Sequence, residues 1–221
     1  MQARMTGHFI TFEGPEGSGK STHIRRLASR LRAAAHDVVV TREPGGTSLG
    51  EAIRGLLQHD AAGESPVPRA EALLFCASRA QLVQTVIRPA LARGAWVLAD
   101  RFADSTFAYQ GFGRGFALAD LQAANAFATG GLIPELTLLL DLDEAAGRRR
   151  LAERHGPKAA ADRFEREPHD FHARLREGFL TLAAAEPERI LVIPTGRAED
   201  AVADDIWQAV TTRFPGAPGA T

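Results

Sequence analysis

Several residue types are scarce in this sequence, and each scarcity excludes a class of protein. The 221 residues contain one cysteine, Cys76, so no intrachain disulfide can form and we expect the chain in a reducing compartment, the cytoplasm. An excess of one charge is also missing, because 26 lysines and arginines stand against 27 aspartates and glutamates. The net charge of −1 provides no basic field, so we expect neither nucleic acid nor a membrane as a partner. No apolar run reaches the ~18 residues that cross a bilayer.

The sequence does contain enough apolar residues for a substantial core. Hydrophobic residues make up 45% of the chain, which fits one domain over residues 1–221. We find neither an internal repeat nor an interdomain linker, and residues 1–8 lack the apolar centre of a signal peptide. Residues 215–221 are rich in proline, glycine and alanine, so we expect this tail to be disordered.

Short apolar runs alternate with helical patterns along the chain. The runs cover residues 8–13, 37–41, 95–100, 136–141 and 189–194. Most of them do not alternate with polar residues, which is typical of strands buried on both faces. Ser48 and Glu51 form a capping box before a helix at 52–57, and residues 71–88 form a long helix that Pro89 stops or kinks. The pattern predicts a three-layer α/β fold with a parallel sheet of about five strands.

A glycine-rich loop, Gly14–Ser21, follows the first apolar run. Its sequence GPEGSGKS matches the phosphate-loop pattern G-x-x-x-x-G-K-S/T between a strand and a helix. In such a loop backbone N–H groups cradle phosphates, Lys20 reaches the β- and γ-phosphates, and the Ser21 hydroxyl coordinates Mg²⁺. A glycine-rich turn without function would need neither the fixed residues nor this context. The predicted ATP-binding residues of the loop are Gly14, Pro15, Glu16, Gly17, Ser18, Gly19, Lys20, Ser21 and Thr22.

Two charged residues, Asp100 and Arg101, end the third apolar run. In doubly wound sheets the carboxyl ends of the strands line the ligand crevice. Asp100 could therefore hold Mg²⁺ and Arg101 could bridge phosphates, although a strand-end salt bridge is the plainer alternative. Asp141 and Asp143 form a competing Mg²⁺ site after the fourth run.

Phe75 and Arg79 stand four residues apart on the expected long helix, so they share one face. An aromatic ring beside a guanidinium can stack on a nucleobase and bind it. The alternative is that Phe75 belongs to the core and Arg79 extends to the solvent. Gln110 offers an amide with both a donor and an acceptor, which suits the edge of a base.

A tight Pro-Gly-Gly turn lies within residues 42–47, and Arg54 follows it on the next helix. A turn beside an arginine can hold an acceptor phosphate. An ordinary turn followed by a solvated arginine remains the alternative.

Four motifs stand in a fixed order: FEGPEGSGKST, TREPGGT at 41–47, LLFCASRAQL at 73–82 and DRFADSTFAYQG at 100–111. With them the sequence resembles bacterial thymidylate kinase from about Phe9 to about Phe214. The resemblance implies the P-loop nucleoside monophosphate kinase fold, a homodimer, and the reaction of ATP with dTMP to ADP and dTDP with Mg²⁺. It implies that dTMP is bound by Glu16, Arg54, Phe75, Arg79, Arg101, Ser105, Tyr109 and Gln110. Tyr109 would exclude a ribose 2′-hydroxyl, and Asp100 would lie near Mg²⁺.

Members of this family carry a catalytic arginine in the phosphate loop or in a lid. The loop here has no arginine, so the chain resembles the lid type, with the lid at about 148–167. The arginines of this region are Arg148, Arg149, Arg150, Arg154, Arg163 and Arg166. Arg163, within a D-R-x-E segment, is the first choice for the catalytic arginine, and Arg154 is the second choice for a contact with ATP. The resemblance thus makes Lys20, Arg101, Arg163 and Glu16 the expected catalytic residues.

Two departures from the family are visible. The segment HGPKAAAD is longer than the family's lid, and Phe102 stands where histidine or tyrosine is expected. Two other functions remain open. A different deoxynucleotide or deoxynucleoside kinase would change the acceptor and keep the chemistry, whereas a regulatory ATP-binding module would not need a second pocket.

Overall fold

The computed structural model describes residues 7–59, 61–155 and 162–217. Within them five strands form one parallel sheet in the order β2-β3-β1-β4-β5. The strands are β1 (Phe9–Glu13), β2 (Val38–Arg42), β3 (Trp96–Asp100), β4 (Leu136–Asp141) and β5 (Ile190–Pro194). Each overlaps one of the five apolar runs, so the predicted parallel sheet is confirmed.

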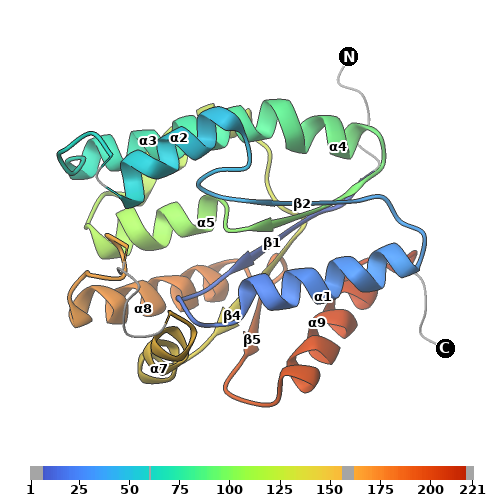
Figure 1. Ribbon diagram of the computed structural model, residues 1–221. Helices are drawn as coiled ribbons and strands as arrows, with labels where there is room; N and C mark the ends of the chain where they lie inside the picture. Colours follow the sequence, from blue (N-terminus) through green and yellow to red (C-terminus); the bar gives the residue numbers. More distant parts are fainter. Residues whose placement is uncertain (1–6, 60, 156–161, 218–221) are drawn as a thin grey trace.

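Helices cover both faces of this sheet (Figure 1). They are α1 (Lys20–Ala33), α2 (Ser48–Gln58), α3 (Pro68–Leu82), α4 (Arg88–Ala92), α5 (Ala103–Thr106), α6 (Leu118–Thr129), α7 (Glu144–His155), α8 (His169–Ala185) and α9 (Glu199–Arg213), with π-helical turns η1 (Val83–Ile87) and η2 (Phe107–Gly113). Alternate residues of β1 face opposite layers: Ile10 packs in a cluster with α1 and α9, and Phe9 in one with η1 and α4. None of these described helices is long and apolar enough to span a membrane.

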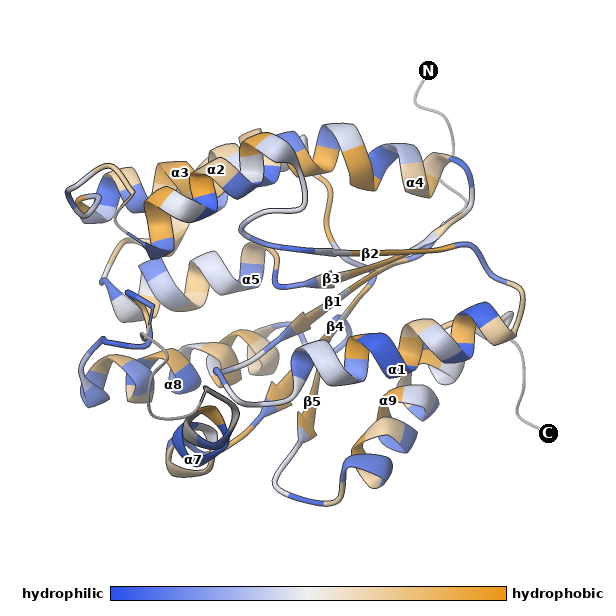
Figure 2. Cartoon of the chain, in the orientation of Figure 1, coloured by the Kyte–Doolittle hydropathy of each residue, from blue (hydrophilic) through white to orange (hydrophobic). Residues whose placement is uncertain are grey.

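The central and the edge strands differ in burial. β1, β3 and β4 are buried along almost their whole length, and Figure 2 shows mostly hydrophobic residues at the centre of the sheet. In the edge strands, by contrast, Val40, Leu191 and Val192 are exposed. The expectation that the runs are buried on both faces is therefore wrong for β2 and β5, because each has a neighbouring strand on one side only.

The predicted capping box of Ser48 and Glu51 is wrong, because the helix begins one residue earlier than such a box requires. Thr47, not Ser48, is the N-cap of α2, and its Oγ1 accepts a hydrogen bond from the Gly50 N–H at 2.9 Å. The Glu51 carboxylate accepts from the Gly46 N–H at 2.9 Å, two residues before the start of the helix. These two hydrogen bonds cap the first turn, and the helix begins at Ser48, before the expected start at residue 52.

Pro89 does not stop the helical path. α3 begins at Pro68, three residues before the expected start at Glu71, and runs through η1 into α4. A proline ring clashes with the carbonyl four residues earlier, which here belongs to Thr85. The wider π turn η1 lies directly before Pro89, which is the second residue of α4.

The C-terminal tail is ordered further than expected. Ala217 is buried in the cluster with α1 and α9, and its N–H donates to the Phe214 carbonyl at 2.8 Å. The expected disorder of 215–221 is therefore wrong for 215–217, while 218–221 lie outside the described residues.

Candidate active site

The phosphate loop owes its shape to glycines with positive φ. Gly14, Gly17 and Gly19 have φ values of 128°, 76° and 92°, which side chains with a Cβ disfavour. A Cβ on Gly14 would lie 2.3 Å from the carbonyl oxygen of Leu140 in β4. The loop thus packs against the sheet and presents the N-terminus of α1 to the cleft, the backbone arrangement that binds phosphate.

Lys20 lies across this loop. Its ammonium donates to the carbonyl oxygens of Gly14 at 3.0 Å and Pro15 at 2.8 Å. Burial lowers the pKa of Lys20. The lysine is therefore held in position over the loop before any phosphate arrives.

Ser21 and Asp100, one of the two predicted sites for Mg²⁺, lie in contact beside the phosphate loop. The Ser21 hydroxyl donates to Asp100 Oδ2 at 2.9 Å, so a hydroxyl and a carboxylate oxygen, the ligands that Mg²⁺ prefers, lie together beside the loop. Asp141 instead binds Arg176 with both carboxylate oxygens, at 2.7 and 2.8 Å. Asp143 accepts from the N–H of Ala146 in the first turn of α7 at 2.9 Å. Both oxygens of Asp141 and Oδ1 of Asp143 thus already have protein partners.

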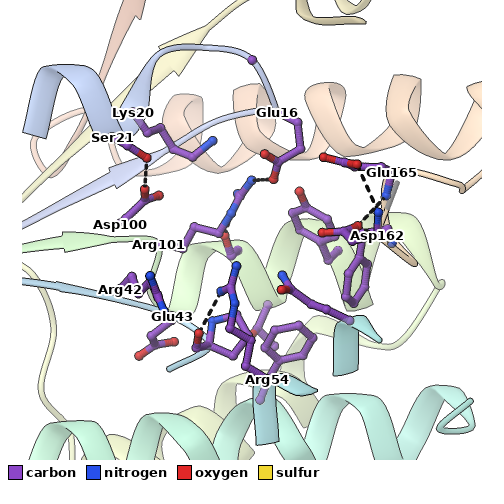
Figure 3. A pocket seen from close by; sticks show the side chains of 18 of the residues that line it. Glu16, Lys20, Ser21, Arg42, Glu43, Arg54, Asp100, Arg101, Asp162 and Glu165 are labelled. Atoms are coloured by element: carbon purple, nitrogen blue, oxygen red, sulfur yellow. Dashed lines mark hydrogen bonds and ion pairs between the residues drawn. The ribbon is translucent and has the colours of Figure 1, made fainter. Parts of the chain in front are cut away.

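A cavity of about 450 Å³ opens between the phosphate loop, the turn before α2, α3 and the turn after β3 (Figure 3). The predicted acceptor residues that line it are Glu16, Arg54, Phe75, Arg101, Ser105, Tyr109 and Gln110. Lys20, Ser21 and Asp100 line the same cavity. The structure therefore joins the donor and acceptor halves in a single cleft.

Arg101 links these two halves. Its backbone has a φ of 71°, a left-handed conformation that is costly for a residue with a side chain. The guanidinium donates to the Gly14 carbonyl at 3.1 Å and to Ser105 Oγ at 3.2 Å, and it pairs with Glu16. It also lies 5.2 Å from the centre of the Tyr109 ring. A cation is thus fixed between the phosphate loop and the acceptor pocket.

Sequence reasoning missed Glu13, which holds the turn that carries Arg101. Glu13 is fully buried at the end of β1 and accepts from the Phe102 N–H at 2.8 Å, the Ser105 N–H at 3.2 Å and the Ser105 hydroxyl at 2.6 Å. The Arg101 guanidinium lies 3.8 Å away. Burial raises the pKa of Glu13 from 4.5 to about 7, against the lowering effect of Arg101. An acidic residue at a buried strand end was the available signal.

Arg79 lies behind the cavity wall and is not one of its lining residues. It is 1% exposed, so it does not extend to the solvent as the alternative reading proposed. It donates to Glu43 at 2.7 Å, to Thr106 Oγ1 at 3.0 Å and to the Phe102 carbonyl at 3.1 Å. In this structure Arg79 supports the turn after β3, and its contact with a nucleotide stays a prediction.

Two arginines flank the turn between β2 and α2, Arg42 at the end of β2 and Arg54 on α2. Arg42 binds the Glu51 carboxylate at 3.1 and 3.0 Å. Arg54 donates to the Pro44 carbonyl at 3.0 Å, and burial lowers its pKa. Both arginines line the cavity (Figure 3), and the binding of an acceptor phosphate there stays a prediction.

Arg163, the first choice for the catalytic arginine, does not line the cavity or reach the phosphate loop here. It pairs with Glu71 at 2.6 Å and donates to the Leu57 carbonyl at 2.9 Å. These partners hold it away from the phosphate loop in this conformation, and its role as the catalytic arginine stays a prediction. The side chain of Arg154 and residues 156–161 of the expected lid lie outside the described part of the chain.

Arg150, another arginine of the expected lid region, does contact the phosphate loop. It donates to the Gly17 carbonyl at 3.4 Å and to the Thr195 carbonyl at 2.9 Å. The sequence placed Arg150 among six candidates but gave no reason to prefer it. Its place on α7 brings it to the loop. The sequence could not show this, because it does not reveal how α7 packs against the loop.

The fold and the cleft define a class of protein. A phosphate loop faces a second pocket with arginines, an aromatic ring and an amide, at the carboxyl ends of a parallel sheet. This is the arrangement of a P-loop nucleoside monophosphate kinase. A family model described as thymidylate kinase matches residues 12–206. The chain belongs to the thymidylate kinase family.

Individual relatives agree with this assignment. The chain is 54% identical to the thymidylate kinase of Deinococcus radiodurans over 207 residues, which cover 94% of this chain and 98% of that one. It is 51% identical to the thymidylate kinase of Clavibacter sepedonicus over 202 residues, 91% and 93% of the two chains. The crystal structure of thymidylate kinase from Ehrlichia chaffeensis superimposes with a TM-score of 0.73 at 31% identity, covering 92% of this chain and 98% of that one. The resemblance and the fold expected from the sequence are thereby confirmed.

Proposed function

We propose that this chain transfers the γ-phosphoryl group of ATP to dTMP and releases ADP and dTDP. One observation carries the proposal: the Arg101 guanidinium lies between the phosphate loop and the acceptor pocket, bound to the Gly14 carbonyl at 3.1 Å and to Glu16. A fixed cation at this junction can neutralise charge on a group that passes from one substrate to the other. The relatives at about half identity, which are named thymidylate kinases, support dTMP as the acceptor.

On the donor side, the loop residues Gly14–Thr22 would bind the ATP phosphates through backbone N–H groups. Lys20, already placed over the loop, would exchange its two carbonyl partners for phosphate oxygens. Ser21 and Asp100 would hold Mg²⁺, which neutralises part of the charge on the β- and γ-phosphates.

On the acceptor side, the cleft offers cations for a phosphate and flat surfaces for a base. Arg54 and Arg101 would bind the dTMP phosphate, and Phe75 would stack on thymine. Ser105, Tyr109 and Gln110 would line the sugar and base, with Tyr109 positioned against a ribose 2′-hydroxyl and Glu16 near the sugar. The acceptor phosphate is already ionised at neutral pH, so the reaction needs positioning and charge neutralisation and no strong general base.

A lid arginine would complete the charge neutralisation. Arg163 would first have to leave Glu71, whereas Arg150 already touches the loop at the Gly17 carbonyl. We therefore include Arg150 with Arg163 and Arg154 as candidates for the contact with ATP. Replacing each with alanine and measuring the turnover number separates them, because only the catalytic arginine lowers turnover by a factor of about 10³ or more.

We further propose that the chain forms a homodimer in the cytoplasm. Phe127 on α6 is 92% exposed, and Leu73 on α3 and Ile133 after α6 are exposed at 64% and 65%. α3 and α6 pack against each other, so these exposed apolar side chains belong to neighbouring elements, and exposed apolar surface of this kind is typical of a protein interface. Light scattering of the wild type and of Phe127→Asp tests the dimer, which the added charge should dissociate.

The acceptor is tested by ADP formation with dTMP, dUMP, dCMP, thymidine and no acceptor. We expect the highest kcat/KM with dTMP and almost no ADP without an acceptor. A higher kcat/KM with another nucleotide would indicate the alternative kinase. Equal ATP turnover with and without dTMP would reject a kinase and leave the regulatory ATP-binding module.

A further inference from the structure

The nitrogen of the Gln110 side-chain amide has a hydrogen-bond partner inside the protein. Gln110 lines the cavity but is only 1% exposed. Its Nε2 donates to Oε1 of Glu71 at 2.8 Å, and Glu71 is not a lining residue. The amide therefore turns its nitrogen away from the cleft and leaves its carbonyl oxygen, Oε1, as the end available to a ligand.

The Glu71 carboxylate stabilises only the orientation in which the nitrogen of the Gln110 amide faces it. It is 1% exposed, and its other partners are Arg114, at 3.3 and 3.2 Å, and Arg163, at 2.6 Å. A carboxylate surrounded by guanidinium donors accepts hydrogen bonds and has none to give. If the Gln110 amide turned over, its carbonyl oxygen would face the carboxylate, and a buried pair of acceptors is strongly unfavourable.

We propose that Glu71 is a specificity-determining positioning residue that fixes the amide of Gln110 with its acceptor toward the base. A fixed acceptor selects a base with an N–H at the facing position. Thymine and uracil carry N3–H there, whereas N3 of cytosine is itself an acceptor and would be repelled. The proposal rests on the acceptor pocket described above, and it concerns thymine against cytosine only.

The size of the expected discrimination between thymine and cytosine follows from the burial of the Gln110 amide. A buried acceptor that loses its donor costs about 1–3 kcal/mol, so the fixed amide contributes roughly 5- to 150-fold to the discrimination. Arg114 adds to the orientation because it donates to both oxygens of the Glu71 carboxylate and holds it in place. Sequence reasoning could not find Glu71, because an acidic residue in the first turn of a helix is common for reasons of helix electrostatics.

The test compares dTMP with 5-methyl-dCMP, which has the same methyl group and shape but the opposite hydrogen-bonding edge. For Glu71→Gln we expect the ratio of kcat/KM for dTMP over 5-methyl-dCMP to fall at least about tenfold, because a glutamine at 71 can donate and lets the Gln110 amide turn over. The ratio cancels any loss of folded enzyme. Glu71→Asp keeps an acceptor-only carboxylate and should retain the preference for dTMP at a lower rate.

Glu167→Gln is the matched control. Glu167 pairs with the same Arg114 at 2.5 Å, so its replacement removes a comparable ion pair while Glu71 still faces Gln110. We expect its substrate ratio to equal that of the wild type. An equal fall in Glu167→Gln and Glu71→Gln would overturn the proposal, since the effect would then come from Arg114.

An unchanged ratio in a folded Glu71→Gln enzyme would also overturn it. If this variant does not fold, Gln110→Met supplies the second test, because it removes the amide altogether. The ratio should then fall as well, and an unchanged ratio would overturn the proposal. A wild-type enzyme that does not phosphorylate dTMP at all would instead reject the proposed function, and the binding ratio of the two nucleotides, measured by calorimetry, would then test Glu71.

Discussion

The two halves of the cleft reach their geometry by different physical means. On the donor side the backbone does most of the positioning, through glycines with positive φ and the N-terminus of α1. On the acceptor side buried charged side chains do it: Glu13, Glu71 and Arg79 lie outside the cavity and hold the residues that line it. A backbone site depends on a short, contiguous motif. A site built by buried ion pairs depends on residues scattered along the chain.

The largest expected effect comes from the residue that joins the two halves. Arg101→Ala should lower turnover by roughly 10²- to 10³-fold, because it removes a fixed cation from the path of the transferred group. ATP affinity should stay within about threefold, since the backbone of the loop binds the phosphates without it. Steady-state kinetics and ATP titration measure the two effects. An ATP affinity that falls as far as turnover would show that the halves are not built separately.

The second prediction concerns the buried carboxylate behind Arg101. Because the pKa of Glu13 in the folded protein is about 7 and its ordinary value is 4.5, the unfolded chain ionises first as the pH rises. The contribution of Glu13 to stability is thus fully present below pH 4.5 and is lost as the pH rises through 7. This loss is on the order of 3 kcal/mol.

The Glu13→Gln variant isolates this contribution. It has no carboxylate to ionise, so its unfolding free energy should fall less than that of the wild type between about pH 4.5 and 7.5. Urea denaturation at several pH values measures the difference. Parallel stability curves for the two proteins would contradict the account of Glu13.

Phe75→Ala should act on the acceptor side alone. Loss of base stacking costs about 1–3 kcal/mol, so dTMP should bind roughly 5- to 150-fold more weakly. ATP affinity should be unchanged and serves as the internal control in the same calorimetric experiment. If dTMP affinity does not change, Phe75 belongs to the core and the placement of the base is wrong.

The smallest effect is expected at the cap of α2. Thr47→Ala removes the acceptor of the Gly50 N–H and should lower the unfolding free energy by about 1 kcal/mol. Thr47→Ser keeps the hydroxyl and should restore most of it. Turnover should change little in either variant, because the arginines that line the cleft remain. A large loss of turnover in Thr47→Ala alone would mean that the acceptor turn depends on this cap.

The sequence predicted the strands and the place of the phosphate loop between β1 and α1, because each of these has a local signal. The strands come from apolar runs, and the loop comes from glycines and a lysine at fixed spacing. The acceptor residues that line the cavity, such as Phe75 and Gln110, were recognised through family motifs. Their supports, Glu13 and Glu71, were missed, because burial and partners more than 30 residues away give them their roles. The position of Arg163 was not predicted for the same reason, because no local sequence pattern reveals its ion pair with Glu71.

The central claim is that one cleft holds both nucleotides and passes a phosphoryl group between them. Phosphorus NMR of the enzyme with ATP, Mg²⁺ and dTMP follows that group directly. We expect the γ-phosphate signal of ATP to disappear as the β-phosphate signal of dTDP appears, one for one, with no change when dTMP is omitted. Release of inorganic phosphate at the same rate with and without dTMP would contradict the account.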